Sequence, residues 1–461
     1  MTIDPRHPLP GTRPLVIGAA RSGLAAARLL ARHGASVRVG DRRPAAAPEF
    51  EAAARELASG GVEFRWGSDD PALLEERDLV IWSPGIPITH PVAVQARARG
   101  VPVLSELELG FLAAHAPLLC ITGTNGKSTT TDLVGALLRA AGRETEVCGN
   151  IGRAICEVAE TVGPTGMLVV EVSSFQLETV ERLRPFIATW LNLTPDHLDR
   201  HDGFDAYGAL KQRLFVRQQE ADYAVWNADD PEVAKRRAGA GSPLEFSGRG
   251  VVEEGAYAED GRITLAWRGG AERLMPARDL RIRGPHNLMN ALAAIATTLP
   301  LEISPSTLRV VLHQYSGLEH RLEDAGEVQG VRFVNDSKAT NVSSLEVALA
   351  SFEEPVVLIA GGRDKGQDFT PLGDLVRRAV RSIVLIGEGA DRIAAAWPGA
   401  PAVRARTLAE AVRVAYETAR PRGTVLLSPG CASYDMFRDF EDRGRSFKAE
   451  VERLRLGEAS A

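Results

Sequence analysis

The chain has 461 residues, 44% of them apolar, and this length predicts about three domains with separate cores. Its formal net charge of −6 argues against general nucleic-acid or anionic-membrane binding, and its four cysteines form no CxxC pair that would suggest a disulfide framework or a zinc site. Because no apolar run has membrane-spanning length and no signal-peptide pattern occurs, we expect a cytoplasmic α/β protein that binds small molecules and does not insert into a membrane.

The first segment, 1–107, begins with "RPLVIGAARSGLAAARLLARHGASVRVGDRR", which predicts strand, loop, helix and strand of a doubly wound sheet. Asp41 closes the second strand, where such folds place an acid against a ribose or a base. The loop "GAARSG" is not a full GxGxxG, so we expect a related use of the fold rather than dinucleotide binding, and a turn without a ligand stays open as an alternative. Residues 83–85 follow another apolar run, at a strand end where open sheets bind ligands.

The second segment, 108–316, contains "APLLCITGTNGKSTTTDLVGALLRAAG", a strand, a glycine loop and a helix. Glycines allow backbone N–H groups to point at phosphate oxygens, and the helix adds its positive end. Lys127 would neutralise the β- and γ-phosphates, and the Ser128 hydroxyl would bind Mg²⁺. Only two residues separate Gly123 from Gly126, against four in the usual P-loop, and a glycine turn with a surface lysine is the alternative.

Acidic and imidazole groups follow the next two predicted strands of this segment. Glu171 ends the run "MLVVE", and its carboxylate is a hard donor of the kind that Mg²⁺ prefers, although a solvated strand-end glutamate is the alternative. His197 lies between Asp196 and Asp199 in "NLTPDHLDRH", whereas we expect His201 to be a structural hydrogen bonder. Further on, 234–280 predicts loops and short hairpins, and "RGPHNLMNALAAIATTL" predicts a capped helix.

The third segment, 317–461, repeats the α/β rhythm. The runs "VRFVNDSKATN", "PVVLIAGGRDKG", "SIVLIGEGA" and "GTVLLSPGCASYDMF" each end in a glycine, serine or aspartate turn. This pattern predicts a second doubly wound sheet.

Ten short blocks together resemble one known family. In chain order they are "GTNGKST", "GNIG", "EVSSFQLE", "LNLTPDHLDRH", "YGALKQRLF", "HN", "HRLE", "NDSKATN", "GGRDKG" and "SPGCASYDMF". Over essentially the whole chain they resemble the Mur ligases, the ATP-dependent amino-acid-adding enzymes of peptidoglycan synthesis, and "NDSKATN" resembles the D-glutamate-adding branch. The resemblance implies an α/β protein of three domains: an N-terminal Rossmann-like UDP-binding domain (1–107), a central P-loop ATPase-like domain with a parallel sheet (108–316) and a C-terminal Rossmann-like glutamate-binding domain (317–461).

The resemblance also implies roles for individual residues. The catalytic residues would be Lys127, His197, Lys211 and Lys338. ATP would be bound by Gly123, Thr124, Asn125, Gly126, Lys127, Ser128, Thr129, Asn287, Arg321 and Asp336. Two Mg²⁺ ions would be held by Ser128, Glu171, His197 and Lys211, the last as a carbamate that presents oxygens where an ammonium would repel the metal. The UDP-substrate would be bound by Arg21, Ser22, Asp41, Arg42, Ser83, Pro84, Gly85, Asn150 and His197. D-glutamate would be bound by Lys338, Thr340, Lys365, Ser433, Tyr434 and Phe440, although Tyr434 stands where some relatives have leucine.

The implied reaction is the addition of D-glutamate to UDP-N-acetylmuramoyl-L-alanine through an acyl phosphate, with ATP as the phosphoryl donor, and we expect a monomer. Closure of the third domain over the second would assemble the water-excluding site. Three alternatives remain at this stage: another Mur-type or folylpolyglutamate-type ligase, an NAD-dependent oxidoreductase, and a nucleotide-binding switch without catalysis. The oxidoreductase would explain "GAARSG" and Asp41 but would leave Lys127, Glu171 and His197 without a purpose.

Overall fold

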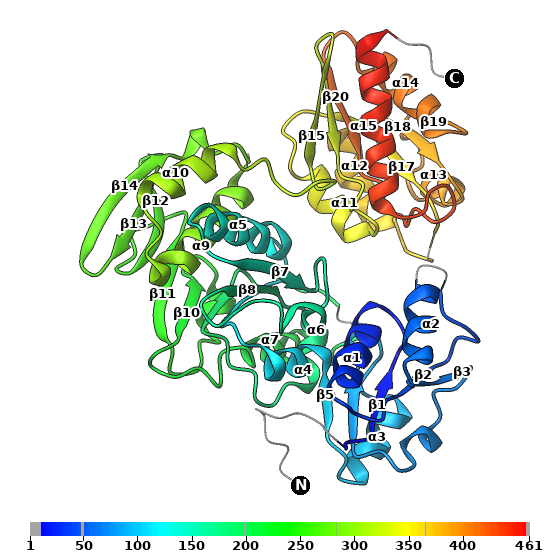
Figure 1. The fold of residues 1–461 in the computed structure, drawn as a ribbon. Helices are drawn as coiled ribbons and strands as arrows, with labels where there is room; N and C mark the ends of the chain where they lie inside the picture. Colours follow the sequence, from blue (N-terminus) through cyan, green and yellow to red (C-terminus); the bar gives the residue numbers. More distant parts are fainter. Residues whose placement is uncertain (1–10, 48–49, 198–199, 283, 365, 458–461) are drawn as a thin grey trace. The chain divides into compact units, whose positions relative to one another are not determined.

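Three β-sheets organise the chain (Figure 1). The computed structural model describes residues 11–47, 50–197, 200–282, 284–364 and 366–457. The chain divides into two compact units, Met1–Tyr315 with the first two sheets and Ser316–Ala461 with the third. The predicted α/β class, with three sheet-centred domains, is confirmed.

The first sheet has the order β3-β2-β1-β4-β5, and all its neighbouring strands are parallel. Its inner strands read as continuous apolar runs because helices cover both faces of a parallel sheet. The strands are β1 (Pro14–Ile17), β2 (Arg38–Asp41), β3 (Glu63–Trp66), β4 (Leu79–Trp82) and β5 (Val103–Ser105), and the helices are α1 (Arg21–Arg32), α2 (Glu51–Ser59) and α3 (Pro91–Ala98).

Helix α4 (Glu106–Ala113) joins the first sheet to the second. Leu107 packs into a core with strands of the second sheet, whereas Leu109 packs into a core with α1 and the first sheet. The domain boundary predicted at 107/108 therefore falls within a helix that contributes to both cores.

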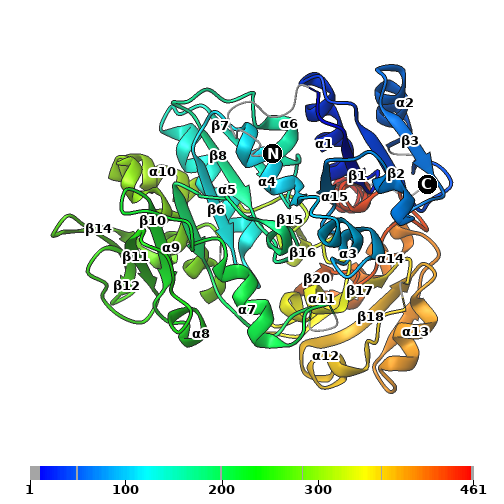
Figure 2. The ribbon, with the colours of Figure 1, turned by 90° about the horizontal axis from the view of Figure 1, so that it is seen from below.

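The second sheet has nine strands in the order β14-β13-β12-β11-β10-β9-β6-β8-β7, which Figure 2 shows from β14 through β10 to β7. Its pairs are parallel from β7 to β12, and β13 and β14 add an antiparallel meander. The strands are β6 (Leu118–Thr122), β7 (Thr145–Gly149), β8 (Met167–Glu171), β9 (Ile187–Trp190), β10 (Tyr223–Asn227), β11 (Ser242–Ser247), β12 (Gly255–Glu259), β13 (Arg262–Trp267) and β14 (Gly270–Pro276). The helices are α5 (Lys127–Ala140), α6 (Ile155–Val158), α7 (Phe204–Gln212), α8 (Pro231–Ala234), α9 (Pro285–Thr298) and α10 (Pro305–Gln314).

The stretch 234–280 differs in part from its prediction. The hairpins β12–β13 and β13–β14 confirm the short hairpins, but the prediction was wrong for β11, which is a parallel strand of the main sheet rather than a loop. Leu244 and Phe246 of β11 are buried in the core, yet only six residues carry the signal and Pro243 interrupts it. The capped helix is confirmed as α9, which has a proline at its first position and Gly284 as its N-cap.

The third sheet has the order β15-β16-β20-β17-β18-β19, and it is parallel except for the β15–β16 pair. This confirms the second doubly wound sheet. The strands are β15 (Glu323–Val328), β16 (Val331–Asn335), β17 (Val356–Gly361), β18 (Val380–Ile386), β19 (Ala402–Arg404) and β20 (Gly423–Leu427). The helices are α11 (Val342–Leu349), α12 (Gly373–Ala379), α13 (Ala390–Ala396), α14 (Leu408–Ala419) and α15 (Phe440–Leu456), and Figure 1 shows α15 beside β15.

Among the described residues, no helix combines the length and the apolar composition that crossing a bilayer requires. The four cysteines are all buried as free thiols.

We predict that Leu292→Ala destabilises the Met1–Tyr315 unit by about 2–5 kcal/mol, because Leu292 is fully buried in α9 and its removal leaves a cavity. Hydrogen exchange should accelerate in α5 and α9 and stay unchanged in β16–β20 of the other unit. Val310→Ala, at a position that is 53% exposed, is the matched control and should change little. Equal effects of the two variants would contradict this description of the core.

Candidate functional site

The glycine loop joins the carboxyl end of β6 to the first turn of α5. Gly126 is the N-cap of α5 with a φ of +82°, and a Cβ there would lie 2.2 Å from Oδ1 of Asn290 on α9. A side chain at this position would be both strained and obstructed, so glycine is required. The helix N-terminus behind the loop, with Ser128 and Thr129 mostly buried, has the geometry that favours an anion.

Asn192 shapes this loop and was missed in the sequence. Its Oδ1 accepts hydrogen bonds from the backbone N–H groups of Thr124 (3.0 Å) and Asn125 (2.8 Å), and its Nδ2 donates to the Asn125 carbonyl (3.1 Å). Asn192 follows β9, the strand beside β6, so both loops emerge at the same sheet edge. A polar residue directly after an apolar strand was the signal that could have identified it.

Two lysine side chains converge on one carbonyl oxygen. Lys127 Nζ donates to the carbonyls of Gly123 (2.9 Å) and Thr124 (2.6 Å), and Lys211 Nζ donates to the same Gly123 carbonyl (2.9 Å). Lys211 lies on α7 with 1% of its surface exposed, and its Nζ is 4.6 Å from the centre of the Tyr207 ring. Burial first, and the charge of Lys127 second, hold the pKa of Lys211 well below its ordinary value.

Glu171 ends β8 at the same edge of the sheet. Its side chain is 2% exposed, and Oε1 accepts a hydrogen bond from Asn150 Nδ2 at 2.7 Å. Its other oxygen, Oε2, is buried without a hydrogen-bond partner among the described residues. A buried carboxylate oxygen is costly to leave unpaired, so the donor set fits a hard cation such as Mg²⁺.

The two histidines after β9 differ in their surroundings. His197 is 46% exposed at its side chain, has a φ of +52°, and contacts Asp196 and the Phe175 ring. Leu198 and Asp199 lie outside the described residues. His201 is buried, and its Nε2 lies 3.0 Å from Ser174 Oγ, which confirms the structural role expected for it.

A cavity of about 590 Å³ opens at the carboxyl ends of the first sheet. Seven of the predicted UDP-substrate residues line it together, namely Arg21, Ser22, Asp41, Arg42, Ser83, Pro84 and Gly85. The sequence did not reveal His90 and Asp69, which also line the cavity and lie 3.0 Å apart. The structure therefore groups these residues around one space large enough for a small ligand.

Two of the lining residues have partners within the protein. Asp41 accepts hydrogen bonds from the Ala19 N–H (2.7 Å) and from Arg43 Nη2 (2.7 Å). Burial opposes its ionisation, but the hydrogen bonds from Arg43 and Ala19 outweigh burial and lower the pKa of Asp41. Arg21 donates to the carbonyls of Gly152 (2.5 Å) and Asn150 (3.1 Å), so it also contacts the loop that holds Glu171.

Most of the predicted residues that the structure describes in the Ser316–Ala461 unit lie on the loops after β16 and β20 and on the first turn of α15, whereas Arg321 precedes β15. Asp336 accepts hydrogen bonds from the Leu322 N–H (3.2 Å) and Ser428 Oγ (2.8 Å), and burial raises its pKa to about 7. Lys338 Nζ lies 5.8 Å from the centre of the Phe440 ring.

The remaining predicted positions differ in exposure. Ser433 is buried, Thr340 is half-buried and Tyr434 is 59% exposed. Lys365 lies outside the described residues. Asn287, in the other unit, begins α9 and its Oδ1 accepts a hydrogen bond from Asn290.

Arg443 is a further residue that the sequence did not reveal. Its guanidinium is fully buried and donates to Oγ (2.9 Å) and the carbonyl (2.8 Å) of Ser337, and to the carbonyls of Cys431 (3.1 Å) and Ala432 (3.3 Å). Arg443 thus links the loop after β16, which contains "DSK", to the loop after β20, which contains "GCAS". In the sequence it lies among many other charged residues of α15, so nothing distinguishes it from an exposed arginine.

These features define a class: an α/β protein that presents a glycine loop before a helix, two lysines and an acid at one edge of its central sheet. The chain matches three family models, described as Mur ligase MurD-like N-terminal domain over residues 12–105, Mur ligase middle domain over 121–298, and Mur ligase glutamate ligase domain over 320–431.

Curated relatives extend the match over nearly the whole chain. Proteins named UDP-N-acetylmuramoylalanine–D-glutamate ligase from Pelotomaculum thermopropionicum and Geobacter metallireducens are 43% and 44% identical to it, covering 96% and 97% of this chain and 98% and 99% of theirs. The chain belongs to the Mur ligase family.

Solved structures show the same fold at low sequence identity. The UDP-N-acetylmuramate-alanine ligase of Thermotoga maritima has a TM-score of 0.59 at 19% identity, with 97% of this chain and 100% of that chain covered. MurF of Acinetobacter baumannii has a TM-score of 0.57 at 18% identity, with coverage of 96% and 93%.

We predict that Asn192→Ala weakens ATP binding about 10-fold, or about 1.4 kcal/mol, because the N–H groups of Thr124 and Asn125 lose their acceptor and the loop loses its shape. Isothermal titration with ATP and Mg²⁺ measures the change. Val216→Ala, at a position that is 55% exposed and outside the predicted ATP site, is the control and should leave the affinity for ATP unchanged. Equal affinities in wild type and Asn192→Ala would contradict the role of this side chain.

We predict that Arg443→Met destabilises the Ser316–Ala461 unit by about 2–4 kcal/mol, because four buried oxygens lose their donors. Arg445→Met is the matched control: this neighbouring arginine is 53% exposed and lies 3.9 Å from Asp439, so its loss should change stability by less than about 0.5 kcal/mol. Thermal unfolding checks both variants. A tolerated Arg443→Met would show that the two loops hold their arrangement without the guanidinium.

Proposed function

We propose that the chain is an ATP-dependent ligase that adds D-glutamate to UDP-N-acetylmuramoyl-L-alanine, with release of ADP and phosphate, in cytoplasmic peptidoglycan precursor synthesis. The convergence of Lys127 and Lys211 on the Gly123 carbonyl, at the edge of the sheet where Glu171 ends β8, carries this proposal. The names of the curated relatives support the choice of D-glutamate over the amino acids that sister ligases add.

The chemistry has two steps. The alanyl carboxylate attacks the γ-phosphorus of ATP, so that ADP leaves and an acyl phosphate forms. The D-glutamate amine then attacks the acyl carbon, phosphate leaves, and the nitrogen loses a proton to give the amide. Two anions meet in the first step, and Lys127 at the start of α5 supplies positive charge where they approach.

Magnesium is the metal that suits this donor set. Ser128, Glu171, His197 and a carbamate on Lys211 would hold two ions, and the unpaired Oε2 of Glu171 is the observation that favours this assignment. Bound Mg²⁺ would neutralise the phosphate oxygens and lower the barrier to attack. Lys127 would hold the phosphates beside it, and Asn150 would orient Glu171 through its 2.7 Å hydrogen bond.

The surroundings of Lys211 support its proposed carbamylation. Because burial and Lys127 lower its pKa, the amine is available in the neutral form that attacks carbon dioxide. The new N–C bond releases one proton and converts the neutral amine into an anion. This change creates attraction between Lys211 and Lys127 and adds two oxygen donors for the metal.

The substrates would occupy different domains, for which we propose the ranges 1–107, 108–316 and 317–461. The uridine diphosphate group would occupy the cavity lined by Arg21 and Ser83, with Asn150 close to the reacting end. ATP would lie on the glycine loop with contributions from Asn287, Arg321 and Asp336. D-glutamate would contact Lys338, Thr340, Lys365, Ser433, Tyr434 and Phe440. We propose a monomer that does not bind nucleic acid.

We predict that phosphate release from ATP and Mg²⁺ in the presence of UDP-N-acetylmuramoyl-L-alanine requires D-glutamate. L-glutamate, L-alanine and meso-diaminopimelate, tested in parallel, should give no release above background. Release with one of these other amino acids would assign the chain to a sister activity of the same mechanism. Phosphate release that does not depend on any amino acid would refute the ligase activity itself.

We predict that ¹³C-bicarbonate gives the wild-type protein a bound carbamate resonance in its NMR spectrum that Lys211→Arg lacks, because the buried amine is the reacting group. The signal should fall as the pH is lowered, since protonation removes the nucleophile. Lys211→Ala should bind Mg²⁺ about 10- to 100-fold more weakly. A wild-type spectrum without the resonance would exclude the modification, whatever the activity of the variants.

A further inference from the structure

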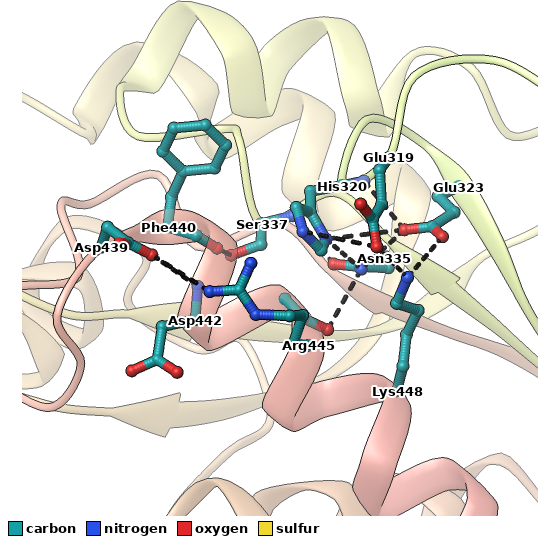
Figure 3. Close-up of polar contacts among 11 residues, drawn as sticks. Glu319, His320, Glu323, Asn335, Ser337, Asp439, Phe440, Asp442, Arg445 and Lys448 are labelled. Carbon is teal, nitrogen blue, oxygen red and sulfur yellow. Dashed lines mark hydrogen bonds and ion pairs between the residues drawn. The ribbon is translucent and has the colours of Figure 1, made fainter.

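A polar cluster in the Ser316–Ala461 unit lies outside the residues assigned so far (Figure 3). We call Glu319, His320, Glu323, Asn335 and Lys448 the His320 cluster. Lys448 Nζ, on α15, lies 2.5 Å from Glu319 Oε1 and 2.9 Å from Glu323 Oε1, as Figure 3 shows. His320 is buried beside these two ion pairs and directly precedes Arg321 in the sequence.

His320 occupies a costly backbone conformation in a closely fitted space. Its φ is +64°, a region that few residues other than glycine adopt, and its side chain is 2% exposed. A Cβ on Gly444 of α15 would lie 2.2 Å from His320 Nδ1, so the helix leaves room for the ring only because glycine stands there. Strain in a residue that is this well enclosed points to a role of its side chain.

The hydrogen bonds define which ring nitrogen carries the proton. Asn335 Oδ1 accepts from the Ser337 N–H (3.2 Å), so Asn335 Nδ2 faces His320 Nδ1 (2.9 Å), Glu323 Oε2 (2.9 Å) and the Gly444 carbonyl (3.3 Å). Nδ1 therefore accepts, and the proton of the neutral ring is on Nε2. Nε2 makes no hydrogen bond to a described residue and lies 3.9 Å from Glu319 Oε1.

The backbone of His320 connects the two predicted subsites of this unit. Its carbonyl accepts the Lys338 N–H (3.0 Å), and its own N–H donates to Glu323 Oε2 (2.8 Å). One residue after Arg321, the Leu322 N–H donates to Asp336 Oδ1 (3.2 Å). Hydrogen bonds thus fix the residues on both sides of Arg321. The backbone of Lys338 is bonded to one of them, His320.

A metal site is a weaker explanation of the His320 cluster than the backbone hydrogen bonds that connect Arg321 with Lys338. Glu319, His320 and Glu323 offer ligand atoms within 4.8 Å of one another. However, the Lys448 ammonium already forms ion pairs with both carboxylates, and Nδ1 of the imidazole is engaged with Asn335. A divalent cation here would meet a fixed positive charge.

We propose that His320 is a positioning residue for ligation: its buried side chain fixes the turn that presents Arg321 to the nucleotide and Lys338 to the incoming amino acid, so that both subsites are set together. This role rests on the proposed function. Since His320 itself touches neither substrate, it acts through the hydrogen bonds of its backbone and of Asn335.

The arrangement requires a neutral imidazole. The charged groups that face the ring are Glu319, Glu323, Arg445 and Lys448. Burial lowers the pKa of His320 below its ordinary value of 6.5, although the two glutamates oppose this. A proton on Nδ1 would face the Asn335 amide hydrogens. The stabilisation is therefore complete above the unfolded pKa and is lost as the pH falls from there through the lower folded pKa.

The test compares the Michaelis constants of three substrates in His320→Ala and His320→Asn. With His320→Ala, KM for ATP and KM for D-glutamate should rise together, about 10-fold or more, while KM for UDP-N-acetylmuramoyl-L-alanine stays constant. His320→Asn should recover most of the loss at pH 8, because asparagine tolerates positive φ and keeps a hydrogen-bonding group. It should also lack the rise in both KM values that we expect of the wild type when the pH falls through the lowered pKa of folded His320.

Val412→Ala, in the core of the same unit, is the control for a purely structural effect: it should lower the melting temperature without changing any KM. Unchanged KM values in His320→Ala, or an equal rise in all three, would overturn the positioning role. A wild type without D-glutamate-dependent turnover would instead overturn the proposed function and this role with it. If the wild type shows D-glutamate-dependent turnover, the KM values of His320→Ala test the positioning role alone.

Discussion

The carbonyl oxygen of Gly123 accepts hydrogen bonds from the side chains of both Lys127 and Lys211, and the remainder of the candidate site depends on this crowding. Two ammonium groups at one oxygen repel each other, and burial penalises the charge of Lys211 further. The buried lysine is therefore driven toward its neutral form. Oε2 of Glu171, which has no hydrogen-bond partner among the described residues, adds an acidic group at the same sheet edge.

The fold creates this crowding because parallel strands end at a common edge. β6, β8 and β9 are neighbours in the central sheet, so the glycine loop, Glu171 and Asn192 emerge side by side although they are far apart in the sequence. The same rule places Ser83 and Asp41 around one cavity in the first sheet. In the third sheet it brings the loops after β16 and β20 together, where Arg443 ties them.

Short motifs with a definite chemistry could be predicted from the sequence, whereas supporting contacts could not. The strand–loop–helix pattern around Lys127 and the apolar run before Glu171 carry local signals, and the three sheets follow from the repeated α/β rhythm. Arg443 and His320 contact residues distant in the chain, so no local pattern marks them, and Asn192 carries only the weak signal of a polar residue after an apolar strand. β11 was missed because it has only six residues and a proline interrupts them. The sequence thus predicted groups for substrate binding, which stay predictions, but it did not predict the side chains that position them.

The most direct test of the account is to follow oxygen from the alanyl carboxylate. UDP-N-acetylmuramoyl-L-alanine labelled with ¹⁸O in that carboxylate is incubated with ATP, Mg²⁺ and D-glutamate, and the released phosphate is analysed by mass spectrometry. Attack of the carboxylate on the γ-phosphorus predicts that the phosphate carries one labelled oxygen from the substrate. Phosphate without the label would mean that water attacks ATP, and it would contradict the claim that this site activates a carboxylate.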